Sequence, residues 1–238
     1  MCSMRVAVMQ PYIFPYLGYY QLVNAADTFV FFDDVNYINK GWINRNNILQ
    51  NNQPLRFTLP LIKASQNKLI NEIEISDYEK WKTSFLKTIE MSYKKATFFQ
   101  EIFFWLNGFF AQQFSLISEI TSASIKSVAA LLQMKTQFCF SSDMKYKTGE
   151  NQDGQMKVLE ICRTLDADQY INPKNGTELY DKNIFEANNI KLYFINMDAF
   201  EYKQFKADLF VPYLSIIDVL MFNGINGTKE LLNKYTLI

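Results

Sequence analysis

The sequence predicts a single α/β domain, residues 1–238, in which a parallel, Rossmann-like sheet begins with a βαβ unit and carries a helical insertion. A strand-like run, a helical segment and a second strand-like run follow one another within about thirty residues, the order of a right-handed βαβ unit. Helical spacing dominates from about residue 78 to 133, which predicts the insertion or subdomain. Hydrophobic residues make up 49% of the chain, enough for one large core.

The opening unit is the clearest of these signals. Residues 5–9 (RVAVM) form an apolar run typical of a buried strand. Two prolines in residues 10–15 (QPYIFP) exclude a regular helix or a central strand there. Residues 18–26 (GYYQLVNAA) place their apolar side chains on one helical face, and residues 28–32 (TFVFF) give a second buried strand. We therefore expect two neighbouring parallel strands.

The segment that follows predicts loops, strands and then helices. Residues 35–53 are polar and rich in asparagine, which indicates a long ordered loop. Residues 55–62 and 70–75 alternate in the manner of strands. Three helices are expected between residues 78 and 133, with a break at Gly108.

The second half of the chain returns to alternating strands and helices. Strands are expected at residues 136–140, 169–172 and 191–197, and helices at residues 155–165, 214–222 and 228–234. No internal repeat or linker divides the chain, so we expect one domain.

Charge and composition exclude several classes of protein. Lysine plus arginine and aspartate plus glutamate both total 24, so a nucleic-acid or anionic-membrane surface is not expected. The chain contains no histidine, which excludes an imidazole base, a Ser–His triad and a histidine-containing zinc site. Proton transfer must fall to Asp, Glu, Lys, Tyr, Cys or the substrate.

The cysteines and the apolar runs indicate a soluble cytoplasmic protein. Cys2, Cys139 and Cys162 are too widely spaced for a metal or redox motif, and we interpret the latter two as core thiols. No stretch approaches the ~20 apolar residues that a membrane span needs, and no leader pattern precedes the first strand.

Polar side chains follow the first two strands at the edge where ligands bind in open parallel sheets. Asp33 and Asp34 end the second strand, and Lys40 and Arg45 lie in the loop after it. Lys40 and Arg45 suit phosphate or carboxylate, while either aspartate can hold a metal ion, accept a sugar hydroxyl or act as a base. These four are the candidate catalytic residues. Turn capping by the aspartates and plain solvation of the two cations remain alternatives.

Three stretches together resemble the WbqC-like family. The first contains Gln-Pro-Tyr-x-x-Pro-Tyr-x-Gly-Tyr from residue 10 and Asn-Arg-Asn from residue 44. The others are residues 167–181 and residues 201–224, the latter with Tyr-x-Gln and Leu-Ser-Ile-Ile-Asp elements. Members of this family occur in O-antigen and related polysaccharide gene sets, and some are described as glycine transferases acting on amino sugars.

These motifs supply the candidate binding residues. The resemblance implies contacts to substrate or nucleotide from Gln10, Tyr12, Gly18, Tyr19, Asn44, Asn46, Tyr202, Gln204, Ser215 and Asp218. Helix capping is the alternative for Ser215, and a plain polar face of a strand is the alternative for Tyr202 and Gln204.

The opening pattern is also distantly similar to nucleotidyltransferases with a His-x-Gly-His motif, above all the tRNA acetate ligases. That similarity implies a nucleotidyltransferase-like sheet and allows ATP and magnesium as cofactors, used to adenylate a carboxylate. The sequence departs from the motif, because Tyr19 follows Gly18 and no histidine can contact the ATP phosphates.

The resemblance implies an enzyme that transfers glycine or another small acyl group to the amine of a nucleotide-linked amino sugar. A non-catalytic nucleotide-sugar-binding protein and a nucleotidyltransferase remain alternatives. The many phenylalanines and tyrosines, 21 and 14, make a homodimer an expected partner arrangement.

Overall fold

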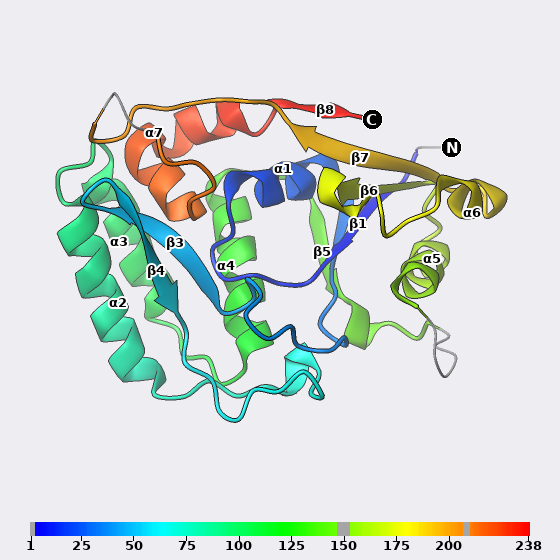
Figure 1. Ribbon diagram of the computed structural model, residues 1–238, viewed down its shortest axis with the longest axis horizontal. Coiled ribbons are helices and arrows are strands. Elements are labelled where there is room, and N and C mark those ends of the chain that lie inside the picture. Colours follow the sequence, from blue (N-terminus) through cyan, green and yellow to red (C-terminus); the bar gives the residue numbers. More distant parts are fainter. Residues whose placement is uncertain (1–2, 147–152, 207–209) are drawn as a thin grey trace.

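A six-stranded sheet forms the centre of the computed structural model, which describes residues 3–146, 153–206 and 210–238 (Figure 1). The strand order is β5-β2-β1-β6-β7-β8, and the first five strands are parallel. β8 pairs antiparallel with β7 at one edge. The strands are β1 (Arg5–Met9), β2 (Thr28–Phe31), β5 (Gln137–Phe140), β6 (Gln169–Pro173), β7 (Lys191–Met197) and β8 (Tyr235–Leu237). The predicted parallel, Rossmann-like sheet is confirmed.

The strand order reverses beside β1. The chain runs outward from β1 to β2 and β5, then returns to place β6 on the other side of β1. Val6 of β1 pairs with Thr28 of β2 on one side and with Tyr170 of β6 on the other, so β1 has a strand neighbour on both sides. In open parallel sheets, ligands bind in the crevice at the carboxyl ends of the strands where the strand order reverses. Here that point lies between β1 and β6.

Helices cover both faces of the sheet. Ala7 of β1 and Phe29 of β2 pack with the helices on one face, whereas Val6 and Val30 pack on the other. This alternation follows from the two-residue period of a strand. The first face is covered by α1 (Leu17–Ala25), α4 (Ile117–Leu131) and α7 (Ile216–Leu231), and the second by α5 (Gly154–Thr164) and α6 (Lys182–Ala187) (Figure 1).

The three helices predicted between residues 78 and 133 are present. They are α2 (Tyr78–Tyr93), α3 (Phe99–Phe110) and α4, and together with a β-hairpin they form the long connection from β2 to β5. The expected break at Gly108 is wrong, because this glycine lies within α3.

Two other sequence predictions for this connection are also wrong. The expected loop at residues 35–53 contains β3 (Arg45–Gln50), which pairs with β4 (Gln53–Thr58) through a turn with positive φ at Asn51 and Asn52. Asparagine tolerates that left-handed conformation, so its abundance marks a hairpin turn here. The strand expected at residues 70–75 is replaced by a 3₁₀ helix, η1 (Ile70–Glu72), and isolated bridges.

The terminal segment α7 consists of two helical stretches that meet at a kink, so the predicted separation of two terminal helices at Asn223-Gly224 is confirmed. Gly224 has φ 63° and ψ −171°, and this non-helical residue joins the two halves. A Cβ on Gly224 would lie 2.6 Å from Cδ1 of Phe98, so the kink lets Phe98 approach the backbone closely.

Two of the three cysteines lie among the described residues. Cys162 is buried, as expected, whereas Cys139 is half-buried, and Cys2 lies outside the described residues. Within residues 3–146, 153–206 and 210–238, no helix has the length and apolar character needed to cross a membrane.

We predict that Gly224→Ala lowers the free energy of unfolding by about 1–3 kcal/mol, the usual cost of a strained backbone position. Gly108→Ala is the matched control, since a Cβ there meets nothing within 4 Å and the residue lies in a helix. It should stabilise the protein by up to about 1 kcal/mol. Urea denaturation measures both values, and equal effects would show that the kink at Gly224 carries no strain.

Candidate functional site

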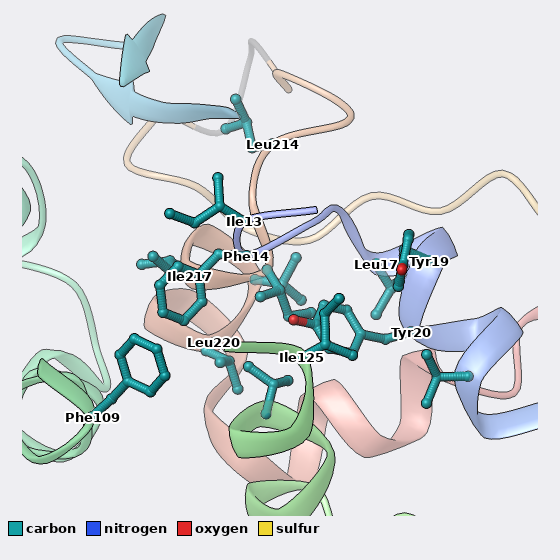
Figure 2. Packing of buried hydrophobic residues seen from close by; sticks show 14 of the residues in the cluster. Ile13, Phe14, Leu17, Tyr19, Tyr20, Phe109, Ile125, Leu214, Ile217 and Leu220 are labelled. Atoms are coloured by element: carbon teal, nitrogen blue, oxygen red, sulfur yellow. The ribbon is translucent and has the colours of Figure 1, made fainter. Parts of the chain in front are cut away.

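The turn after β1 is fixed by the backbone of Phe14. This residue has φ 41°. The centroid of its ring lies 5.2 Å from that of Phe109, in an edge-to-face arrangement. Its carbonyl oxygen accepts hydrogen bonds of 2.7 Å from Asn46 Nδ2 and 2.7 Å from Ser215 Oγ. Figure 2 shows Phe14 among buried apolar side chains that include Ile217 and Leu220. The turn, β3 and the start of α7 are therefore joined at one atom.

A pocket of about 570 Å³ opens beside this junction, at the carboxyl end of β7 and the first turns of α1 and α7. Five aromatic side chains and two carboxylates line it. These residues are Tyr16, Phe200, Tyr202, Phe210, Tyr213, Asp198 and Glu201. No lysine or arginine belongs to the lining, as far as the described part of the chain shows. The wall is therefore aromatic and acidic.

Gly18 shapes one side of this pocket. A Cβ on Gly18 would lie 2.4 Å from Cε2 of Tyr16, so the Tyr16 ring lies against the first turn of α1. The ring is 6.1 Å from that of Tyr213, and burial raises the pKa of the Tyr16 hydroxyl. Gly18, a predicted binding residue, thus acts on the pocket by making room for Tyr16.

Asp218 lies behind the pocket with its side chain completely buried. Tyr202 Oη donates a 2.5 Å hydrogen bond to its Oδ2, and Gln204 Nε2 donates one of 3.1 Å to the same oxygen. Tyr93 Oη of α2 donates a 2.7 Å bond to Oδ1. Burial raises the pKa of the carboxyl, although the three hydrogen bonds oppose that shift. The structure thus joins Tyr202, Gln204 and Asp218, three of the predicted binding residues.

Three other predicted binding residues have their side chains in structural hydrogen bonds. Asn44 accepts from Tyr37 Oη at 2.9 Å and donates to the Leu59 carbonyl at 2.8 Å. Asn46 is held by the Phe14 carbonyl, and Ser215 also accepts from the Ile217 amide at 3.3 Å as the N-cap of α7. The capping alternative for Ser215 is therefore the observed arrangement.

The remaining predicted binding residues surround the end of β1. Tyr19 is buried and its hydroxyl donates to the Gln10 carbonyl at 2.8 Å. The Tyr12 ring lies 5.5 Å from that of Tyr19, and burial raises the pKa of the Tyr12 hydroxyl to about 12. Gln10 and Tyr12 are half-buried at the expected ligand edge, but neither lines the pocket.

Asp33 and Asp34 meet the end of β5. Asp33 is buried and accepts from the Ser142 amide at 3.1 Å and from Ser142 Oγ at 2.8 Å. Ser141 Oγ donates a 2.5 Å hydrogen bond to Asp34 Oδ1, and Tyr146 Oη donates one of 2.5 Å to Asp34 Oδ2. Burial and Asp34 raise the pKa of Tyr146. Each carboxylate oxygen is thus already engaged, and no cluster of three metal-ligating side chains occurs within the described ranges.

Lys40 and Arg45 lie apart from the pocket lining. Lys40 is exposed and has φ 61° in the loop before β3. Arg45 begins β3, and its Nε is buried without a hydrogen-bond partner among the described residues. The positive charge of Arg45 lowers the pKa of Tyr37, against a larger increase caused by burial. Their proposed contact with phosphate stays a prediction.

Sequence reasoning missed several residues of this site. Asp198 directly follows β7, so the strand-end rule that selected Asp33 could also have selected it. Tyr16 lies within the recognised turn, and Glu201 lies within a recognised stretch. Tyr93 carries no local signal, because its link to Asp218 spans 125 residues of sequence.

The fold and this site define a mostly parallel α/β protein with an aromatic, acidic pocket at the carboxyl end of β7, beside the start of α1. Residues 10–230 match the WbqC-like protein family, and the chain belongs to that family. A relative from Mycobacterium tuberculosis, named uncharacterized protein Rv1507c, is 26% identical over 222 residues, which cover 92% of this chain and 93% of the relative. No solved structure matches the chain.

We predict that Asp218→Asn changes how stability depends on pH. The folded-state pKa of Asp218 is raised, so between pH 4 and neutrality the folded protein binds more protons at this site than the unfolded chain does. Ionised Asp218 therefore lowers stability as the pH rises. Relative to the wild type, Asp218→Asn should gain unfolding free energy from pH 4 to 7, measured by urea denaturation at each pH. A constant difference would mean that the pKa of Asp218 is ordinary.

Proposed function

We propose that this protein is a transferase of surface-polysaccharide biosynthesis that joins glycine or another small acyl group to the amine of a nucleotide-linked amino sugar. Its membership of the WbqC-like family supports the biological setting. The observation that carries the proposal is the pocket at the carboxyl edge of the sheet, with its aromatic rings and its two carboxylates.

The chemistry of the pocket wall suits an amino sugar. Carboxylates accept hydrogen bonds from sugar hydroxyls and from an ammonium group, and Asp198 and Glu201 provide them. Aromatic faces such as those of Tyr202 and Phe210 pack against the apolar face of a sugar ring. The volume of about 570 Å³ lies within the range common for small-molecule sites.

The diphosphate of the nucleotide sugar would lie outside this acidic wall. Lys174 is exposed in η3 (Lys174–Gly176), which directly follows β6 at the same sheet edge. β6 is the neighbour of β7, whose end carries Asp198. In this proposal the phosphates of a sugar in the pocket extend toward the carboxyl end of β6, where Lys174 directly follows the strand.

The acyl donor must be activated before the amine can attack it. An acyl-adenylate formed from ATP is one such donor, and a pre-activated thioester is another. Since the oxygens of Asp33 and Asp34 are engaged by Ser141, Ser142 and Tyr146, the proposal assigns no metal ion to them. The absence of histidine favours a second candidate, a non-catalytic protein that only binds the nucleotide sugar.

We predict that a nucleotide-linked amino sugar raises the melting temperature of the purified protein. A ligand at a hundredfold excess over its Kd stabilises by about 2.7 kcal/mol. Asp198→Asn should abolish most of this shift because it removes a charged acceptor from the pocket. Asp166→Asn is the control, since Asp166 is exposed in the turn after α5.

The same samples, supplied with glycine, ATP and magnesium or with a glycyl thioester, should yield a glycylated sugar detectable by mass spectrometry. Binding without product from any donor would favour the binding protein. Neither binding nor product would contradict both candidates.

A further inference from the structure

Asp218 is a buried carboxylate without a cation. Its side chain is 0% exposed, and no lysine or arginine of the described ranges forms an ion pair with it. Burying a carboxylate in this way is costly unless hydrogen bonds or protonation compensate. Among the described residues, two phenols and one amide donate hydrogen bonds to it, from Tyr93, Tyr202 and Gln204. The arrangement suits a group that gains and loses a proton.

We infer that Tyr202 and Asp218 form the proton-accepting pair of the pocket, with Tyr202 taking a proton from the acceptor amine as it passes its own to Asp218. This inference rests on the proposed function. It assigns the acid–base chemistry, which the chain must perform without histidine, to residues outside the four predicted catalytic ones.

The geometry distinguishes the two phenols bound to Asp218. Tyr202 lines the pocket, whereas Tyr93 is completely buried in α2 and does not line it. Tyr202 donates its one hydroxyl proton to Oδ2 at 2.5 Å, so its oxygen remains an acceptor. Tyr93 instead accepts from the Leu49 amide at 2.8 Å, which ties it to β3. Of the residues that the structure describes, Tyr202 is the one that both lines the pocket and donates to the buried carboxylate.

The surroundings of the pair favour proton uptake. Burial raises the pKa of Asp218, which makes its carboxylate a stronger base than an exposed aspartate. The titratable groups that face Asp218 are Tyr93 from α2 and Tyr202 from the segment after β7. Both phenols remain protonated, because burial and the negative charge of Asp218 raise their pKa values.

An activated acyl donor supplies the leaving group that the amine displaces. The neutral amine attacks the acyl carbon, and the new C–N bond forms from the nitrogen lone pair. The bond from that carbon to its leaving group breaks, and the leaving group departs as an anion with the electron pair, as AMP does from an acyl-adenylate. The amine binds as an ammonium, and the proton that it loses to become neutral passes to Tyr202 Oη as the Tyr202 proton passes to Asp218. The second nitrogen proton, lost when the C–N bond forms, passes to the departing anion, and Asp218 returns its proton to solvent after product release.

The test compares Tyr202→Phe with Tyr93→Phe, since each variant removes one hydroxyl donor to the same carboxylate. Tyr202→Phe should lower kcat for glycylation by about a hundredfold or more with little change in KM, the usual size of a general acid–base contribution. Tyr93→Phe should lower it less than about tenfold. Asp218→Asn should lower kcat and remove the acidic limb of its pH profile. Equal losses of kcat in the two tyrosine variants would contradict the role of Tyr202 and Asp218 as the proton-accepting pair. So would an acidic limb of the kcat profile that Asp218→Asn leaves unchanged.

A second measurement does not need turnover. Infrared difference spectra, with Asp218→Asn as the reference, report whether Asp218 is protonated. An amino sugar bound without any acyl donor should increase the protonated carboxyl band, whereas its N-acetyl analogue should not. No difference between these two sugars would overturn the pair. A band increase without any amide product would support the pair and contradict the transferase.

Discussion

The carbonyl oxygen of Phe14 is the atom on which the pocket edge depends. It accepts from Asn46 of β3 and from Ser215 at the start of α7, so three segments far apart in sequence meet there. The positive φ of Phe14 directs this oxygen while its ring lies in the core against Phe109. Buried polar groups need such partners, because an unpaired carbonyl costs about 1–3 kcal/mol.

Asp218, one turn further along α7, joins a second set of segments through hydrogen bonds. Through Tyr93 it contacts α2, and through Tyr202 and Gln204 it contacts the segment that follows β7. Gln204 also bonds the Val211 backbone in both directions, at 2.9 and 3.1 Å, which closes this segment back onto itself. Tyr202 of the aromatic wall is therefore held by a hydrogen bond to the first turn of α7, and such support is what a precise site requires.

Local signals predicted the sheet, because strand runs such as residues 5–9 carry a clear pattern. They failed at residues 70–75, where contacts with other segments replaced a strand by η1. In the site, short motifs found Tyr202, Gln204 and Asp218 but could not show that they bond to one another. Asn46 and Ser215 were selected for ligand contact, yet their partner is the distant Phe14 backbone. Such long-range partners leave no trace in local sequence.

We propose that the pocket lined by Tyr16, Asp198 and Tyr202 receives the amino sugar. A crystal structure of the protein with a nucleotide-linked amino sugar tests this most directly. We expect the sugar ring against the aromatic wall, with its amine within hydrogen-bonding distance of Asp198, Glu201 or Tyr202. A sugar bound instead beside Asp33 and Asp34, at the ends of β2 and β5, would contradict it.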